Sequence, residues 1–167
     1  MAKNTIKLVK PQSPSSDDGE AFVSTELWNV IAYHLRVAQE TSFQAFKRRV
    51  GNADLKPGRY AILSIIAEHP GLTATDLSRA CGRDKSTLTP ALKDLSQRGF
   101  VVRERSSTDE RSYIINLTPA GKKLLQKLRV HAHAHDQQLN RIVGQENRAE
   151  FVATLRRIVD VLSDEDD

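Results

Sequence analysis

The 167-residue chain has little of what defines several large classes of protein. Its one cysteine excludes an internal disulfide framework, and with it a small disulfide-stapled secreted domain. No apolar run approaches the roughly 18 residues of a membrane-spanning helix, and the N-terminus lacks the apolar stretch of a signal peptide. We therefore expect a cytoplasmic protein, long enough for one domain with a proper core.

Catalytic motifs are also missing. No Ser/His/Asp or Cys/His arrangement, phosphate-binding loop or dinucleotide fingerprint occurs at a useful spacing, so we expect neither an enzyme nor a bound cofactor. The formal net charge is only +4, partly because the chain ends in four acidic residues. Between residues 83 and 122, eight Lys or Arg stand against five Asp or Glu. Nucleic-acid affinity would therefore depend on where these charges point.

The segment after Cys81 predicts a helix with two different faces. Asp84 is a good N-cap, because a short carboxylate can accept backbone N–H groups that the first helical turn leaves unpaired. An apolar stripe follows at helical spacing, formed by Leu88, Ala91, Leu92 and Leu95. The opposite face is polar with few carboxylates, and it carries Lys85, Ser86, Thr89, Pro90, Lys93 and Gln97. Such a face can approach phosphates and base edges without charge repulsion.

A two-stranded ribbon is expected next. Residues 100–102 and 113–115 are β-prone, and the polar segment between them is too long for a two-residue turn. Arg103, Arg105 and Arg111 lie along this wing, where a guanidinium suits the negative potential of a minor groove. Asp109 precedes Arg111 by two residues, and it could hold the hairpin or orient that arginine.

Four strings in this order and spacing resemble the MarR family of bacterial transcriptional regulators. They are Ser86-Thr-Leu-Thr-Pro90, Leu95-Ser-Gln-Arg-Gly-Phe100, Asp109-Glu-Arg111 and Leu117-Thr-Pro-Ala-Gly121. With long helices on both sides, the resemblance covers the chain from about Leu27 to Leu162. It implies a homodimer that binds a double-stranded DNA operator, with paired recognition helices in successive major grooves and wings in the flanking minor grooves.

Residue by residue, the resemblance carries DNA contact onto two sets. The recognition set is Lys85, Ser86, Thr87, Thr89, Pro90 and Lys93, and the wing set includes Asp109 and Arg111. It also implies that a small-molecule or redox signal releases the DNA. Pro90 lies several residues inside the helix and removes a backbone donor to Ser86, so we expect a local kink or a loosened first turn there.

The expected fold is mainly α with a small β-wing, an α+β winged helix-turn-helix core with long terminal helices for dimerisation. Residues 1–22 are expected to form a mobile arm, 23–162 a single domain, and 163–167 an acidic tail. Within the domain, the winged helix spans about 57–117, and the dimerisation helices about 25–49, 119–143 and 146–162. Packing of those helices within one subunit is the alternative to dimerisation.

For the effector, the family pocket lies between the first, second and fifth helices. Aromatic and cationic candidates on the first two are Trp28, Tyr33, His34, Arg36, Arg59 and Tyr60. This mixture fits an anionic aromatic metabolite or its CoA thioester. The alternative for each residue is an ordinary core or solvated position.

Other signals remain open. His131 and His135 are four residues apart on one helix face, a spacing that suits two zinc ligands but more often marks a solvated or interfacial face. Further ligands would have to come from His34, His69 and nearby acids. Cys81 raises the possibility of redox sensing, although a small buried side chain is the ordinary expectation there. A nonspecific nucleoid protein is the remaining alternative, and its affinity would not depend on sequence.

Overall fold

The computed structural model describes residues 26–51, 57–106 and 112–163. In chain order the elements are η1 (Leu27–Asn29), α1 (Ile31–Val50), α2 (Pro57–Glu68), β1 (Leu72–Thr73), α3 (Ala74–Cys81), α4 (Lys85–Gln97), β2 (Val101–Arg105), β3 (Tyr113–Leu117), α5 (Pro119–Val143) and α6 (Arg148–Ser163). A mainly helical chain with one small antiparallel sheet confirms the predicted fold class.

Side-chain hydroxyls and carboxylates define where the helices begin. Thr73 caps α3 in a capping box, in which its hydroxyl accepts from Asp76 N–H and the Asp76 carboxylate accepts from Thr73 N–H. The Thr73 hydroxyl also donates to the Asp76 carboxylate at 2.6 Å, and this bond, followed by that from Thr73 N–H, holds the pKa of Asp76 below its ordinary value. Thr118 caps α5, with Pro119 at the first helical position. The cap predicted at Asp84 is also present.

The core lies where α2, α3, α4 and α5 meet the sheet. Its fully buried side chains are Ile62, Leu63, Ile66, Leu77, Leu88, Leu95, Ile115 and Leu128. Burial of each such side chain contributes on the order of 1.5–3 kcal/mol. The predicted stripe on α4 is confirmed, because Leu88, Leu92 and Leu95 are buried and Ala91 packs against them.

The sheet has the order β1-β3-β2, with both pairings antiparallel. In the β2–β3 hairpin, Val101 lies opposite Leu117 and Arg105 opposite Tyr113. The two-residue strand β1 adds Leu72 opposite Ile115, which joins the turn after α2 to the base of the wing. This short strand was not predicted, because two residues carry no periodic signal.

The first long helix begins later than predicted. Residues 27–29 form a single 3-10 turn, and Val30 is extended (φ −91°, ψ 114°), so α1 starts at Ile31 rather than near residue 25. The last helix likewise starts at Arg148, because a turn follows Gly144. The proposed arm and acidic tail lie outside the described residues, apart from Ser163.

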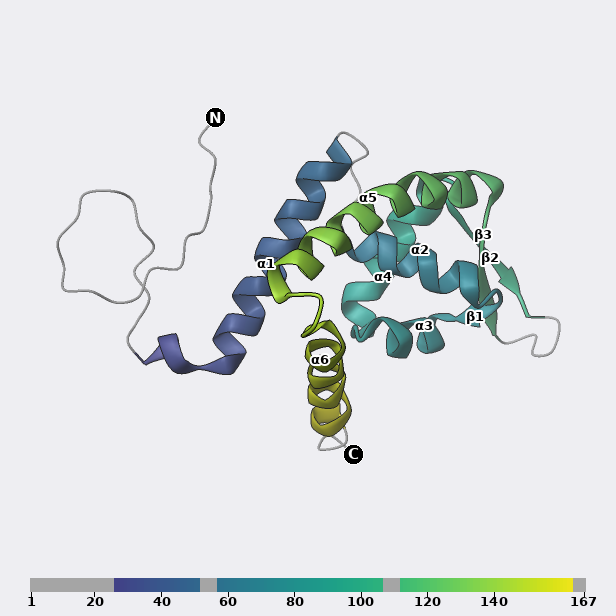
Figure 1. The fold of residues 1–167 in the computed structure, drawn as a ribbon. Helices are drawn as coiled ribbons and strands as arrows, with labels where there is room; N and C mark the ends of the chain where they lie inside the picture. Colours follow the sequence, from purple (N-terminus) through teal and green to yellow (C-terminus); the bar gives the residue numbers. More distant parts are fainter. Residues whose placement is uncertain (1–25, 52–56, 107–111, 164–167) are drawn as a thin grey trace, which may run out of the picture.

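The helices α1 and α5 each pack partly on the winged core and extend beyond it. In Figure 1, α1 runs beside α5, with which it is in contact, while α6 extends away from the end of α5. No side chain of α6 is buried within the chain. Large apolar side chains on these helices are exposed, including Ile31 (72%), Val130 (70%) and Ile142 (74%). The apolar stripes of these helices therefore remain largely uncovered by this chain.

Candidate nucleic-acid interface

The N-terminus of α4 is held by one carboxylate. Asp84 Oδ1 accepts from Thr87 N–H at 2.7 Å and also from the Ser86 hydroxyl, while Oδ2 accepts from the Thr87 hydroxyl at 3.1 Å. These hydrogen bonds, that from Ser86 first, hold the pKa of Asp84 below its ordinary value. Asp84 thus orders the first turn of the helix and the two hydroxyls that the sequence nominated for DNA contact.

The outward face of α4 is polar along its length. All six nominated residues are exposed: Lys85, Ser86, Thr87, Thr89, Pro90 and Lys93. The helix continues through Pro90 without interruption. Thr89 donates its hydroxyl to the Lys85 carbonyl at 2.7 Å, a bond to the preceding turn that often bends a helix. The predicted local kink at Pro90 stays a prediction.

The turn between α3 and α4 has a defined geometry. Gly82 caps α3 in the left-handed conformation (φ 57°, ψ 40°), which glycine adopts without a steric penalty. Arg83 N–H then donates to the Ser78 carbonyl at 3.1 Å, and the Ser78 hydroxyl donates back to the Arg83 carbonyl. These bonds fix the direction in which α4 leaves α3.

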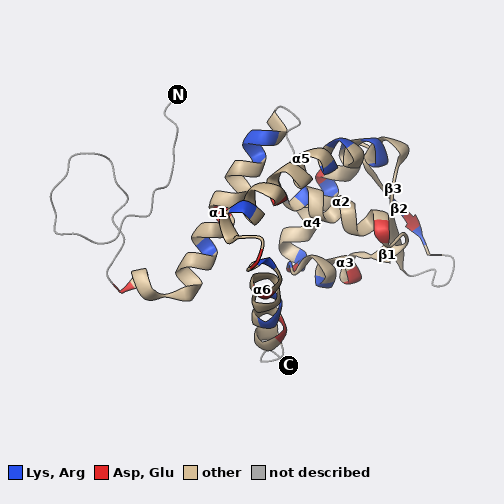
Figure 2. Cartoon of the chain, viewed as in Figure 1, with Lys and Arg blue, Asp and Glu red and all other residues tan. Residues whose placement is uncertain are grey.

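The wing presents cations on β2. Arg103 and Arg105 are exposed, and the Arg103 guanidinium lies 5.3 Å from the centre of the Tyr113 ring on the paired strand. Basic and acidic positions alternate along this strand, as Figure 2 shows. The Glu104 carboxylate accepts a hydrogen bond from Asn116 Nδ2 at 2.9 Å, so it is held by a partner within the hairpin. The nominated Asp109 and Arg111 lie outside the described residues.

The six effector candidates fall into separate groups. Near the start of α1, the His34 ring packs edge-on against Trp28 and Tyr33, and the Arg36 guanidinium lies over Tyr33. His34 Nε2 lies 2.7 Å from the Trp28 carbonyl oxygen. Arg59 lines a cleft beside α4, whereas Tyr60 lines a separate cavity beside α5. The other four candidates line neither space.

The cavity lies between α1, α2 and α5. It has a volume of about 230 Å³ and is lined by Ser42, Phe43, Phe46, Tyr60, Ala132, His135, Asp136 and Leu139. The buried His135 has its Nε2 2.9 Å from the Ser42 hydroxyl and packs edge-on against Phe46. Its Nδ1 is buried without a hydrogen-bond partner among the described residues. Sequence reasoning did not single out Ser42, and it weighed His135 as a zinc ligand or as part of a solvated or interfacial face. It did not predict the cavity, which forms only when the helices pack.

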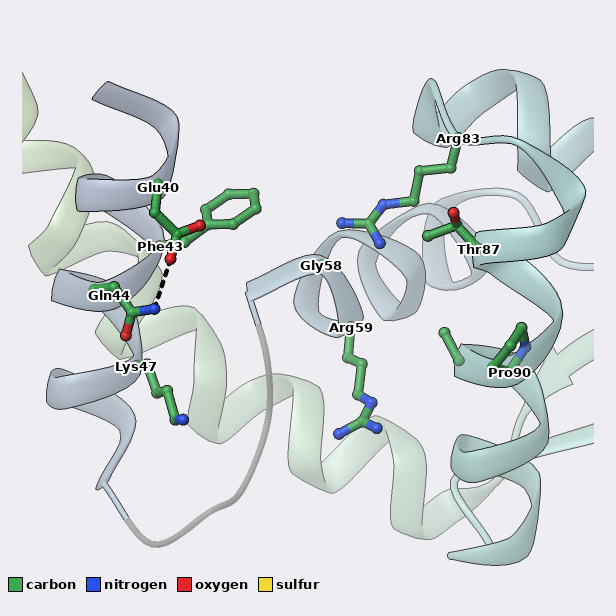
Figure 3. A pocket seen from close by; sticks show the side chains of 10 residues that line it. Glu40, Phe43, Gln44, Lys47, Gly58, Arg59, Arg83, Thr87 and Pro90 are labelled. Atoms are coloured by element: carbon green, nitrogen blue, oxygen red, sulfur yellow. Dashed lines mark hydrogen bonds between the residues drawn. The ribbon is translucent and has the colours of Figure 1, made fainter. Parts of the chain in front are cut away.

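The cleft lies between α1, the start of α2 and α4. Its volume is about 470 Å³, and its lining is Glu40, Phe43, Gln44, Lys47, Gly58, Arg59, Arg83, Thr87, Pro90 and Ala91. Figure 3 shows Lys47, Arg59 and Arg83 reaching toward it from three different elements. Arg59 Nη2 lies 3.0 Å from Asp94 Oδ2 on α4. Neither Lys47 nor Arg83 was singled out from the sequence, since no local motif marks them.

The metal and redox alternatives gain no support from the described part of the chain. There, no three His, Cys, Asp or Glu side chains are grouped so that they could hold a metal ion. Burial raises the pKa of the Cys81 thiol, and the nearby Arg83 only partly opposes this, so the reactive thiolate is disfavoured. No helix within the described ranges is long and apolar enough to cross a membrane.

A polar recognition helix after a tight turn, followed by a cationic β-hairpin, defines a winged helix-turn-helix protein. The MarR family model matches residues 53–112, which include α2, α3, α4 and β2. The organic hydroperoxide resistance transcriptional regulator of Bacillus subtilis (strain 168) is 31% identical over 106 residues, covering 64% of this chain and 72% of that relative. The chain belongs to the MarR family.

Longer similarities agree. A protein of Thauera aromatica assigned to transcriptional regulation of the hcr operon is 28% identical over 146 residues, 87% of this chain and 88% of its own. The transcriptional repressor CouR, solved on a 23-mer DNA duplex, superposes with a TM-score of 0.74 at 28% identity, covering 83% of this chain and 99% of CouR. CouR bound to p-coumaroyl-CoA also gives a TM-score of 0.74, at 27% identity over 83% of this chain and 98% of CouR. The chain is accordingly a transcriptional regulator and not an enzyme.

Proposed function

We propose that this regulator binds a pseudo-palindromic operator as a homodimer, acts as a repressor, and releases the DNA when an anionic aromatic metabolite or its CoA thioester binds. The single observation that carries the proposal is the ordered, exposed polar face of α4 beside the cationic hairpin. Because a two-fold axis would relate the two recognition helices, we expect half-sites about 10 to 10.5 base pairs apart.

The DNA contacts follow from exposure and charge. Lys85 and Lys93 would meet phosphates, the hydroxyls of Ser86, Thr87 and Thr89 would meet phosphates or base edges, and Pro90 would contact bases through its ring. On the wing, Arg103, Arg105 and Arg111 would reach the minor groove, with Asp109 orienting Arg111.

Footprinting on the DNA upstream of the protein's own gene, followed by binding titrations, tests this interface. Arg111→Ala should weaken operator binding and reduce the salt slope by about one unit, because one phosphate-proximal cation is lost. Lys127→Ala on the exposed surface of α5 serves as the matched control and should keep both values. Unchanged affinity and slope for Arg111→Ala contradict the wing assignment. Equal affinity for a scrambled operator would indicate a nonspecific nucleoid protein.

Dimerisation is supported by the uncovered apolar faces of the long helices. On α6, Phe151, Val159 and Leu162 are 47%, 62% and 57% exposed in this chain. A second copy would remove such surface from water, which is the main driving force of association. Truncation before Glu146 should give monomers or aggregates with reduced operator affinity, as two half-sites are no longer held together. A truncated chain that sediments as a well-folded dimer contradicts this.

The cavity between α1, α2 and α5 is our first candidate for the aromatic part of the effector. Phe46 and Tyr60 offer aromatic contacts, and the unpartnered Nδ1 of His135 offers a hydrogen bond to a polar ligand atom. CouR, at 27% identity, was solved with p-coumaroyl-CoA, which supports an effector of this kind. The cluster of Trp28, Tyr33, His34 and Arg36 is the second candidate site.

Operator binding should be titrated in parallel with aromatic acids, their CoA thioesters, zinc with a chelator, and peroxide. We expect the aromatic ligands to release the operator. Tyr60→Ala should reduce this release if the cavity is the effector site, and Arg36→Ala should reduce it if the cluster around Tyr33 is the site. Arg59→Ala should also reduce the response to these ligands. Response to zinc alone, abolished by His131→Ala, would establish a metal sensor instead. Response to peroxide alone, abolished by Cys81→Ser, would establish a redox sensor.

A further inference from the structure

The cleft between α1, α2 and α4 concentrates positive charge. Lys47 comes from the last turn of α1, Arg59 from the first turn of α2, and Arg83 from the turn before α4. Among the described residues of its lining, Glu40 is the one carboxylate, and it accepts a hydrogen bond from Gln44 at 2.7 Å. Glu40 in the lining and Asp94, which pairs with Arg59, offset part of this charge, but an excess of cations remains at the positive end of the α2 dipole and favours an anion in this space.

The position of Arg83 depends on a glycine. A side chain at position 58 would collide with the Arg83 guanidinium, which lies over the first turn of α2. Gly58 therefore leaves room for Arg83 to reach across from the turn before α4 toward the cleft, as Figure 3 shows. The charge is thus brought together by tertiary packing and not by neighbours in the sequence.

The cleft is large and adjoins the apolar cavity. Its volume of about 470 Å³ lies in the range of small-molecule sites, and Phe43 lines both spaces. One ligand could therefore place an aromatic group in the cavity and an anionic group in the cleft. A single ligand carboxylate has too few acceptor oxygens to reach cations on three different segments, whereas a diphosphate has enough oxygens to engage all three.

The same cleft is linked directly to the recognition helix. Arg59 forms an ion pair with Asp94 of α4 across 3.0 Å, and the side chains are 15% and 36% exposed. The guanidinium of Arg98, the C-cap residue of α4, lies 3.8 Å from the same Asp94 oxygen. An anion in the cleft would compete with Asp94 for the Arg59 guanidinium.

We propose that the cleft binds the phosphate-bearing part of the effector, and that the bound phosphate takes Arg59 from Asp94 and so frees α4 from the start of α2. The inference rests on the proposed function, in which an anionic effector releases the operator. It specifies the ligand class as a phosphorylated carrier thioester, and it assigns Asp94 as a positioning residue for the recognition helix. Loss of the Asp94 charge should therefore favour the anion and disfavour DNA.

Direct calorimetric titration of the full-length protein without DNA tests the site independently of operator release. The probes are coenzyme A, p-coumaroyl-CoA, p-coumarate and inorganic pyrophosphate. Lys47→Gln/Arg83→Gln should lower coenzyme A affinity at least tenfold, equivalent to about 1.4 kcal/mol. Lys127→Gln/Arg129→Gln, which removes two exposed cations of α5, is the control and should keep the wild-type affinity. Circular dichroism melts should verify that each variant is folded.

Asp94→Asn tests the exchange. This variant keeps the size of the side chain but weakens its hold on Arg59, so coenzyme A affinity should rise several-fold while operator affinity falls by a similar factor. If Asp94 served only the stability of α4, operator affinity would fall without a rise in coenzyme A affinity. Asp94→Glu, which retains the charge, should restore both values toward those of the wild type.

The outcomes are distinguishable. If coenzyme A has the same affinity for Lys47→Gln/Arg83→Gln as for the wild type, the proposed phosphate site is wrong. If this variant loses operator affinity but keeps coenzyme A affinity, Lys47 and Arg83 contact DNA instead. If p-coumarate binds as tightly as p-coumaroyl-CoA and coenzyme A does not bind, the carrier assignment is wrong. If pyrophosphate matches coenzyme A, the cleft recognises a free diphosphate, which also overturns the carrier assignment. If coenzyme A thioesters bind but do not release the operator, the proposed effector response is wrong, whereas the phosphate site in the cleft is still supported.

Discussion

Replacing Gly121 by Ala should destabilise the protein through one close backbone approach. Gly121 lies in the first turn of α5, where a Cβ atom would overlap the Phe100 carbonyl oxygen and lie 3.0 Å from its carbonyl carbon. The same oxygen accepts a hydrogen bond from Thr118 N–H at 3.1 Å. Phe100 directly precedes β2, so the start of the wing and the start of α5 are held together at this point.

The magnitude follows from three terms. Overpacking against backbone costs about 1–3 kcal/mol, since a carbonyl cannot rotate away as a flexible side chain can. Loss of the hydrogen bond between Thr118 and Phe100 costs about 1 kcal/mol more. The higher helix propensity of alanine returns about 1 kcal/mol. The net loss is about 1–3 kcal/mol, equivalent to a melting temperature lower by roughly 3–10 °C for a chain of this size.

Thermal unfolding should be followed by circular dichroism at one fixed protein concentration, because dimerisation makes the midpoint depend on concentration. Lys122→Ala, at the exposed next position of the same helix, is the matched control and should shift the unfolding free energy by less than about 0.5 kcal/mol. A Gly121→Ala protein as stable as the wild type would show that the Phe100 carbonyl does not approach the helix as closely as described.

Three further substitutions test α4, the buried His135 and the base of the wing. Asp84→Ala should reduce operator affinity, because Ser86 and Thr87 lose the carboxylate that orders them. Asp84→Asn should retain most of the operator affinity. Equal affinity of the alanine variant and the wild type in a gel-shift titration contradicts this role of Asp84. Burial, reinforced by Arg49 and opposed by Asp136, lowers the pKa of His135, so the unfolded chain takes up its proton first as the pH falls, and the free energy of unfolding should decrease below about pH 6.5. His135→Gln should lack that decrease in denaturant titrations across pH 5–7, and an identical pH profile would rule out this assignment. Asn116→Ala should cost about 1–2 kcal/mol, because Gly71 N–H loses its side-chain acceptor and Glu104 its donor, and a urea midpoint equal to that of the wild type would argue against both bonds.

The local features of the winged core were readable from the sequence because they depend on neighbouring residues. Asp84 precedes α4 by one position, and a short polar side chain there can satisfy the first free N–H groups of the helix whatever the rest of the fold does. The stripe of Leu88, Leu92 and Leu95 follows from helical periodicity alone. The polar face opposite that stripe, and hence the candidate DNA interface on α4, came from the same pattern.

The contacts between different helices and strands were decided only by the tertiary structure. The strand β1 exists because Leu72 meets Ile115, more than forty positions away, and two residues have no period to read. Tyr60 and Arg59 are adjacent in sequence yet line different spaces, because successive residues on a helix point about 100° apart. Arg59 meets Asp94, and Lys47 and Arg83 share a cleft, only through the rotation and crossing of the helices that carry them. Spacing along a chain encodes which residues share a helix face, but which faces meet is decided by the packing of the whole core.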